Sequence, residues 1–172
     1  MKIDSDDFEL FGLPRRFALE RRELDERWRA VQAQVHPDRF AVEGAAAQRV
    51  AMQWAMRVNE AYRRLKDPVE RAALLCQLAG VVIDRHDNAA MPREFLMQQM
   101  QWREALEEAA DGLAVRGLQS EVEQHRKGLL DDLRIDLDDR ADAASASARV
   151  RSLMFVDRFL DDVHRRLEAL EA

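Results

Sequence analysis

The tripeptide His36-Pro37-Asp38 places an imidazole and a carboxylate in one short segment. Such a pair can act as a general base and the group that orients it, which would make hydrolysis the reaction. No nucleophile, substrate pocket or third orienting group is apparent in the neighbouring residues, so we favour the other use of a stiff exposed loop, contact with a second protein. Hydrolysis through His36 and Asp38 is one alternative. A plain proline-containing turn, in which Asp38 caps the next element of the chain, is another.

The other histidines and the cysteine offer little metal chemistry. His86, His125 and His164 do not stand at metal-ligand spacing, and the latter two lie on or near apolar stripes, so we interpret them as histidines at the edge of a bundle. Cys76 is the only cysteine, which excludes an intramolecular disulfide and predicts a small buried side chain. Because the sequence also lacks a phosphate-binding glycine loop and a nucleophile elbow, we expect no cofactor, no metal and no catalytic activity.

Two long amphipathic helices flank the His-Pro-Asp loop, from about residue 20 to 35 and from about 45 to 66. Apolar residues recur along both at helical spacing. In the first helix they are Leu24, Trp28, Val31 and Val35, opposite a mixed-charge face of Arg22, Glu26, Arg29 and Ala33. In the second they are Ala47, Val50, Ala51, Trp54, Val58, Ala61, Tyr62 and Leu65. A tight loop between such helices predicts an antiparallel pair with the tripeptide exposed at its tip.

Shorter elements complete the first half of the chain. Residues 6 to 13 read as a brief apolar helix that ends at Gly12, and Asp67-Pro68 reads as the start of a fourth helix that runs to about Leu78. The first long helix should be poorly capped, because Glu20 stands where Ser, Thr or Asp would cap better.

Three further helical patterns come after a polar, irregular stretch from residue 80 to 92, which we interpret as a linker between domains. They cover about residues 93 to 110, 114 to 134 and 142 to 170, enough for a separate three-helix unit. The last pattern includes the Ala-Ser-Ala run near residues 143 to 148, because alanine is a strong helix former and an apolar stripe continues from it.

The helix that starts near residue 93 carries two apolar stripes. Phe95, Trp102, Leu106 and Ala109 form the one that a bundle requires. Leu96, Met97 and Met100 form a second, centred about 145° away at ~100° per residue, with Arg103 and Glu104 beside it. Methionine adapts to irregular partners, so the second stripe predicts a protein-binding surface. The alternative is packing against the first domain.

Phe155 also lies outside the apolar stripe of its own helix. That stripe consists of Val150, Leu153, Val156 and Leu160. Phe155 therefore needs another neighbour, which strengthens the prediction of a binding surface.

The composition of the 172 residues, 47% apolar and 35% charged with six Gly and four Pro, predicts a mainly helical protein. No stretch is long enough for a membrane span, and the N-terminal residues lack the pattern of a signal peptide, so we expect a cytoplasmic protein. A formal charge of −6 disfavours nucleic-acid binding as the main activity.

Several segments together resemble the HscB family, the J-type co-chaperones of bacterial iron–sulfur cluster assembly. The resemblance covers essentially the whole chain. The segments are Phe8–Pro14, His36–Ala41, Asn59–Leu65, Pro68–Ala72, Phe95–Met97 and Arg103-Glu104. The resemblance implies an all-α fold, in which an N-terminal J-domain, an antiparallel helical hairpin with short helices, precedes a C-terminal three-helix bundle. We expect the J-domain at residues 1–79, the linker at 80–92 and the bundle at 93–172.

The resemblance also implies two protein partners and no nucleic acid, membrane or small-molecule substrate. By resemblance, His36, Pro37 and Asp38 contact the ATPase domain of the DnaK-type chaperone HscA and stimulate it. Supporting contacts would come from Arg22, Arg29 and Arg39. Asp25 and Glu26 dilute the positive charge of this face.

The second implied partner is the iron–sulfur scaffold protein IscU. By resemblance, its binding surface maps onto Leu96, Met97, Met100, Gln101, Arg103, Glu104 and Phe155. Gln101 is neutral where an acidic residue is expected, and Trp102 stands where an aliphatic residue is usual. A J-domain co-chaperone for a different client protein is the alternative.

Overall fold

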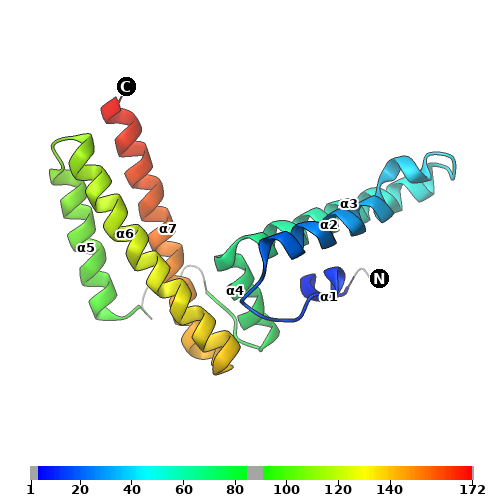
Figure 1. The fold of residues 1–172 in the computed structure, drawn as a ribbon, viewed down its shortest axis with the longest axis horizontal. Coiled ribbons are helices and arrows are strands. Elements are labelled where there is room, and N and C mark those ends of the chain that lie inside the picture. Colours follow the sequence, from blue (N-terminus) through cyan, green and yellow to red (C-terminus); the bar gives the residue numbers. More distant parts are fainter. Residues whose placement is uncertain (1–3, 85–90, 172) are drawn as a thin grey trace. The chain divides into compact units, whose positions relative to one another are not determined.

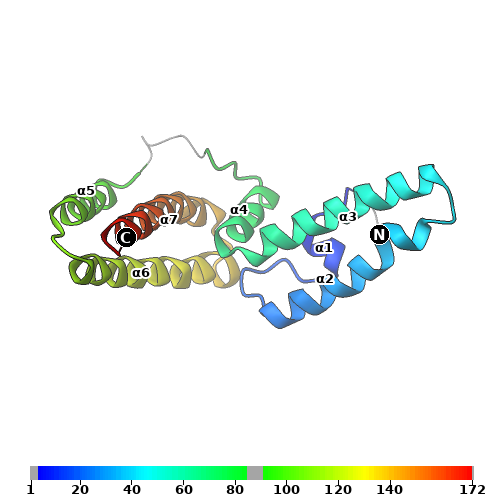
Figure 2. The same ribbon diagram turned by 90° about the horizontal axis from the view of Figure 1, so that it is seen from above.

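The computed structural model describes residues 4–84 and 91–171, and these ranges form helices joined by short connections (Figures 1 and 2). The elements are α1 (Asp7–Phe11), α2 (Arg21–Val35), a 3₁₀ turn η1 (Pro37–Phe40), α3 (Ala45–Lys66), α4 (Pro68–Leu78), α5 (Arg93–Glu108), α6 (Gly112–Arg134), a π-helical turn η2 (Ile135–Asp139) and α7 (Ala143–Glu171). Each predicted helix is present, with small shifts at its ends. The chain divides into two compact units, Met1–Leu75 and Cys76–Ala172.

In the first unit, α2 and α3 form an antiparallel hairpin, with the His-Pro-Asp loop at the tip in Figure 1. The buried side chains that hold it together come from α1, α2 and α3 and from the segment after α1. They are Phe8, Leu10, Phe11, Leu13, Leu24, Val35, Val58, Ala61 and Leu65. The apolar stripes predicted for both long helices thus pack against each other, which buries their apolar surface away from water.

One residue of the predicted stripe on α3 departs from this pattern. Val50 is 54% exposed and lines an open groove with Phe40 and Trp54 near the loop. Val50 thus shares a groove with its stripe neighbours but is not buried. The regular core lies closer to α1, so only two helices are available to cover side chains at this end of the hairpin.

The short helix α1 is held by its ends and by one buried carboxylate. Asp6 caps it by accepting from the backbone N–H of Phe8, and Gly12 ends it in the left-handed conformation, with φ of 62°. Asp7 is 1% exposed, and its carboxylate accepts two hydrogen bonds from Arg64, at 2.7 and 2.8 Å. It also forms an ion pair with Arg57, in which the nitrogen and oxygen are 2.8 Å apart. A charge this deeply buried is stable only when it is paired, so Asp7 fixes α1 against α3.

In the second unit, α5, α6 and α7 lie side by side as a three-helix bundle (Figure 2). As predicted, Phe95, Trp102 and Ala109 are buried in its core. The Trp102 ring stacks on Phe159, with centroids 5.8 Å apart, and its indole N–H donates to Glu121 at 3.0 Å. The bundle therefore accommodates the unusual tryptophan both by packing and by satisfying its one polar atom.

The connection between α6 and α7 is a feature that the sequence analysis did not predict. The π-helical turn η2 buries Asp136 to 1% exposure, and Arg149 of α7 donates to this carboxylate at 2.6 Å. Asp142 then caps α7 by accepting from the N–H of Ser145 at 3.0 Å. These contacts reverse the chain direction between two long helices.

Cys76 is fully buried, as predicted from its type, and its thiol donates to the carbonyl of Ala143 at 3.7 Å. Burial raises the pKa of this thiol to about 11. The side chain therefore stays protonated at neutral pH and packs as a small apolar group. No helix in the described ranges combines the length and apolarity that crossing a bilayer requires.

Candidate functional site

The His-Pro-Asp loop is exposed and held in shape by its own histidine. His36 ends α2 and caps η1, because its Nδ1 accepts the backbone N–H of Asp38 at 3.3 Å. The side chains of His36 and Asp38 are 51% and 91% exposed. Capping of the next element by Asp38, the alternative drawn from the sequence, is wrong, since Asp38 lies inside η1 and the N-cap of α3 is Gly44, with no side-chain capping bond.

Two further features tie the loop down. Pro37 occupies the first turn of η1, where its fixed φ suits the geometry and its missing N–H is not needed. Arg39 reaches back and donates from Nη1 to the carbonyl of Ala33 at 3.0 Å, which links η1 to the last turn of α2. The loop thus presents Asp38 on a preorganised turn.

This geometry does not prepare His36 as a catalytic base. In a triad-type base, one ring nitrogen faces an orienting carboxylate and the other faces the nucleophile. Here Nδ1 accepts a backbone N–H, while the Asp38 carboxylate lies farther away at 3.6 Å. The arrangement stabilises the shape of the loop and leaves the His36 side chain 51% exposed.

The solvent-facing side of α2 is less acidic than its sequence suggests. Asp25 turns toward α3, where it accepts hydrogen bonds from Arg21 and Tyr62, each at 2.8 Å, and these bonds lower its pKa. Arg22 pairs with Glu26 at 2.9 Å and stays 89% exposed. Arg29 is exposed one turn closer to the loop than Asp25. Asp25 and Glu26 thus each pair with an arginine of their own helix, Arg21 and Arg22.

The second predicted surface lies on α5. Leu96, Met97 and Met100 are 38%, 52% and 71% exposed, and we call these three residues the methionine patch. Arg103 and Glu104 are exposed on the following turn. Gln101 is also exposed and accepts from the side chain of Gln98 at 3.5 Å. The two stripes predicted for this helix therefore face different surroundings, one the core and the other solvent.

Phe155 of α7 packs against α5. Its half-buried ring meets Phe95 edge-on, with centroids 6.4 Å apart, and the Arg158 guanidinium lies 5.1 Å from its centroid. The expectation that Phe155 needs a neighbour outside its own stripe is thus met within the bundle. The contact between Phe95 and Phe155 thus forms a seam between α5 and α7.

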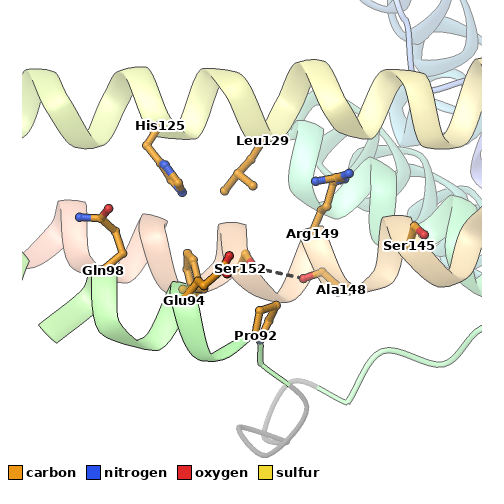
Figure 3. A pocket seen from close by; sticks show the side chains of 10 residues that line it. Pro92, Glu94, Gln98, His125, Leu129, Ser145, Ala148, Arg149 and Ser152 are labelled. Atoms are coloured by element: carbon orange, nitrogen blue, oxygen red, sulfur yellow. Dashed lines mark hydrogen bonds between the residues drawn. The ribbon is translucent and has the colours of Figure 1, made fainter.

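A cavity of about 520 Å³ opens on another side of the bundle (Figure 3). In Figure 3, His125 and Leu129 point from α6 toward the other two helices. Its lining consists of Pro92, Glu94, Phe95, Gln98, His125, Leu129, Ser145, Ala148, Arg149 and Ser152. None of the predicted binding residues lines it. Arg149, its cationic residue, is bound to Asp132 and Asp136.

The histidines show no metal-binding arrangement in the part of the chain that the structure describes. His125 packs against Phe95 and Trp102, with ring centroids 6.3 and 5.1 Å away. His164 is exposed beside Gln119. His86 lies outside the described residues. Within those residues, no group of three or more His, Cys, Asp or Glu side chains could hold a metal ion.

Comparison with known proteins finds relatives that share one name. The chain is 50% identical to the "Co-chaperone protein HscB homolog" of Bordetella petrii over 92% of its length and 94% of the relative's. It is also 50% identical to the protein of the same name from Burkholderia multivorans, covering 95% of both chains. The chain belongs to the HscB co-chaperone family. Residues 91–164 also match the family model described as the HSCB C-terminal oligomerisation domain.

Solved HscB structures share the fold. Chaperone HscB from Vibrio cholerae superimposes with a TM-score of 0.85 at 33% identity, covering 96% of this chain and 99% of that one. Human co-chaperone HscB gives 0.86 at 25% identity, covering 98% and 83%. The all-α arrangement of an N-terminal J-domain and a C-terminal three-helix bundle is therefore confirmed, and the hairpin with its His-Pro-Asp loop is the J-domain.

Proposed function

We propose that this HscB-family co-chaperone acts in iron–sulfur cluster assembly as an adaptor. Its C-terminal bundle holds the scaffold protein IscU, and its J-domain delivers that scaffold to the DnaK-type chaperone HscA and stimulates the chaperone's ATPase. The observation that carries the proposal is the presence of two separate exposed surfaces, the His-Pro-Asp loop in one unit and the methionine patch in the other.

The J-domain surface suits a brief, regulatory contact. The loop is stiffened by Pro37 and by the hydrogen bonds of His36 and Arg39, so little conformational entropy remains to be lost on binding. The exposed cations Arg22 and Arg29 on α2 can steer an acidic partner toward the loop. We therefore assign His36, Pro37 and Asp38 to the chaperone contact, with Arg22, Arg29 and Arg39 as supporting residues.

The bundle surface suits a protein client. The methionine patch exposes three large apolar side chains within two turns of α5, and such clusters mark interaction sites on soluble proteins. Charged and polar side chains border it, as the rim of a protein interface requires. We assign the scaffold contact to Leu96, Met97, Met100, Gln101, Arg103, Glu104 and Phe155. A different client bound at the same patch is the competing proposal.

The test measures steady-state ATP hydrolysis by HscA with this protein and IscU added separately and together. We expect synergy, with far greater stimulation when both are present. His36→Gln should abolish stimulation while leaving folding and IscU binding intact. His164→Gln, which changes an exposed histidine of the bundle in the same way, is the matched control. Normal stimulation by His36→Gln would contradict the assigned mechanism.

A second pair of variants tests the client. Met97→Ala combined with Phe155→Ala should remove IscU binding and the synergy, but keep the weak stimulation by the J-domain alone. Leu113→Ala truncates another apolar side chain of the bundle, 78% exposed on α6, and should leave both unchanged. Stimulation of HscA that is indifferent to IscU would keep the J-domain assignment and reject the scaffold as client.

A further inference from the structure

Helix α2 ends just before a proline, which leaves one of its last carbonyl groups without the usual donor. In an α-helix the carbonyl of one residue accepts from the backbone N–H four positions later. For Ala33 that position is Pro37, which has no N–H. Pro37 also disfavours helical geometry at His36, whose φ of −63° and ψ of 129° are extended. The helix therefore cannot continue, and the Ala33 carbonyl is open to a donor from elsewhere.

Arg39 supplies that donor. Its Nη1 donates to the carbonyl of Ala33 at 3.0 Å, and its backbone N–H donates to the carbonyl of His36 at 3.0 Å. In the part of the chain that the structure describes, the Arg39 side chain forms this hydrogen bond and no ion pair. The guanidinium is thus engaged with its own chain rather than with a neighbouring carboxylate.

The bond to Ala33 differs from the other hydrogen bonds of the loop. The N–H of Asp38 bonds Nδ1 of His36, and the N–H of Arg39 bonds the His36 carbonyl, so both bonds begin and end inside the loop. Among the hydrogen bonds that the structure describes for residues 36–39, the one from Arg39 to Ala33 crosses to the body of α2. The inner bonds fix the shape of the loop, whereas this bond fixes its orientation on the helix.

We propose that Arg39 is a positioning residue for Asp38, because its hydrogen bond to Ala33 sets the direction in which the loop presents the Asp38 carboxylate to the chaperone. This inference rests on the proposed function and gives Arg39 a role that does not depend on its charge. The Asp38 side chain is 91% exposed, so little besides the loop directs it. A contact made through one carboxylate depends on that direction, since hydrogen bonds weaken as their geometry departs from linear.

The exposure of this bond predicts that Arg39 variants stay folded. Arg39 and Ala33 are both exposed, so water can replace the hydrogen bond when the guanidinium is removed. Unchanged melting curves should accompany any loss of stimulation, which then reports the orientation of the loop rather than unfolding.

The test compares Arg39→Ala with the wild type in two measurements. The first is the carbonyl ¹³C resonance of Ala33 in the full chain alone, which should move upfield when the hydrogen bond is lost. The second is stimulation of the HscA ATPase as a function of co-chaperone concentration at low and at high salt. Maximal stimulation should fall by roughly five- to tenfold, because small misplacements of an interacting group are costly. The salt dependence of the half-maximal concentration should stay as in the wild type, because no charge is removed from the contact.

Arg39→Lys separates position from charge. It keeps the positive charge, but its ammonium group stands one bond closer to the backbone than Nη1 and lacks the guanidinium fork. This variant should displace the Ala33 resonance and lose stimulation as Arg39→Ala does. Arg49→Ala removes an exposed arginine from α3 of the same unit and is the matched control, with both measurements at their wild-type values.

The inference requires stimulation to follow the Ala33 resonance in every Arg39 variant. Wild-type stimulation in a variant whose Ala33 resonance is displaced would overturn it, and in Arg39→Lys this result would show that Arg39 acts through its charge. An Ala33 resonance that does not move in Arg39→Ala would exclude the hydrogen bond itself. Failure of the wild-type protein to stimulate HscA would overturn the proposed function and the inference with it, while the resonance would still report the bond.

Discussion

The aromatic rings of Phe95 and Phe155 pack edge to face, with their centroids 6.4 Å apart. Phe95 is a core residue, only 8% exposed, whereas Phe155 is half-buried. The core of the bundle thus fixes the orientation of an aromatic residue that we assign to partner binding. Preorganisation of this kind lowers the entropy lost when a partner binds.

Because Phe155 packs on the core and Met100 is exposed, substitutions of the two residues should affect stability differently. Phe155→Ala should lower the free energy of unfolding by about 1–3 kcal/mol, because a half-buried ring leaves a partial void, and should also weaken IscU binding. Met100→Ala removes a side chain that is 71% exposed, so it should weaken binding with little change in stability. Urea denaturation and calorimetric titration measure the two effects. Equal stability of both variants would contradict the role of Phe155 in the seam.

Asp7 should be one of the most sensitive positions in the J-domain. Asp7→Asn removes the charge that pairs with Arg57 and Arg64 and leaves these partly buried cations without it. We expect a loss of about 2–4 kcal/mol in the free energy of unfolding, since breaking one side of a buried ion pair is costly. Glu9→Gln neutralises an exposed carboxylate of the same helix and serves as the control, with a change below about 0.5 kcal/mol.

A better N-cap residue should stabilise the start of α2. Glu20 occupies the N-cap in extended conformation and makes no side-chain capping bond, as the sequence predicts. Glu20→Ser would place a hydroxyl three residues before Glu23 and complete a capping box. We expect a gain of about 0.5–1 kcal/mol in the free energy of unfolding by urea denaturation. Glu20→Ala offers no acceptor, so a similar gain in this variant would show that capping is not the cause.

Cys76 should make the free energy of unfolding fall at high pH. Burial raises the pKa of its thiol to about 11, above the ordinary value of 9.0, so the folded state retains a proton that the unfolded state releases. The stabilising contribution is complete below about pH 9 and is lost as the pH rises toward 11, by on the order of 2 kcal/mol. Urea denaturation at pH 8 to 11 of wild type and Cys76→Ala isolates it. Parallel curves for the two proteins would contradict the prediction.

Reactivity gives an independent check on Cys76. At pH 7.5 the native thiol should react with a disulfide reagent far more slowly than the thiol in urea, since the thiolate is the reactive form and the side chain is fully buried. Equal rates in the two conditions would show that the thiol is accessible in the native state.

Much of the fold could be predicted because helical periodicity is a local property. The stripe from Leu24 to Val35 and the core stripe of α5 were both identified from spacing alone, and both pack into the hydrophobic cores. The exposed position of Met97 and Met100 was likewise predicted, because a bundle cannot bury two faces of one helix.

Other features depend on which distant residues meet, and spacing carries no such information. That His36 rather than Asp38 caps η1, and that Val50 lies in an open groove, depends on the path of the chain at the hairpin tip. The signal for Asp7 was present as an acidic residue inside an apolar helix, but its partners lie 50 and 57 positions away.

The sequence by itself determined the helices, the faces they bury, the His-Pro-Asp loop between two of them and the surplus apolar face on α5, because each of these depends on residue type and the 3.6-residue repeat. Only the tertiary structure decided that Phe155 packs on Phe95, that Asp25 turns toward Tyr62, and that Arg158 lies over the Phe155 ring. The physical reason is that side-chain packing between distant segments selects one arrangement among many that the same periodicity allows.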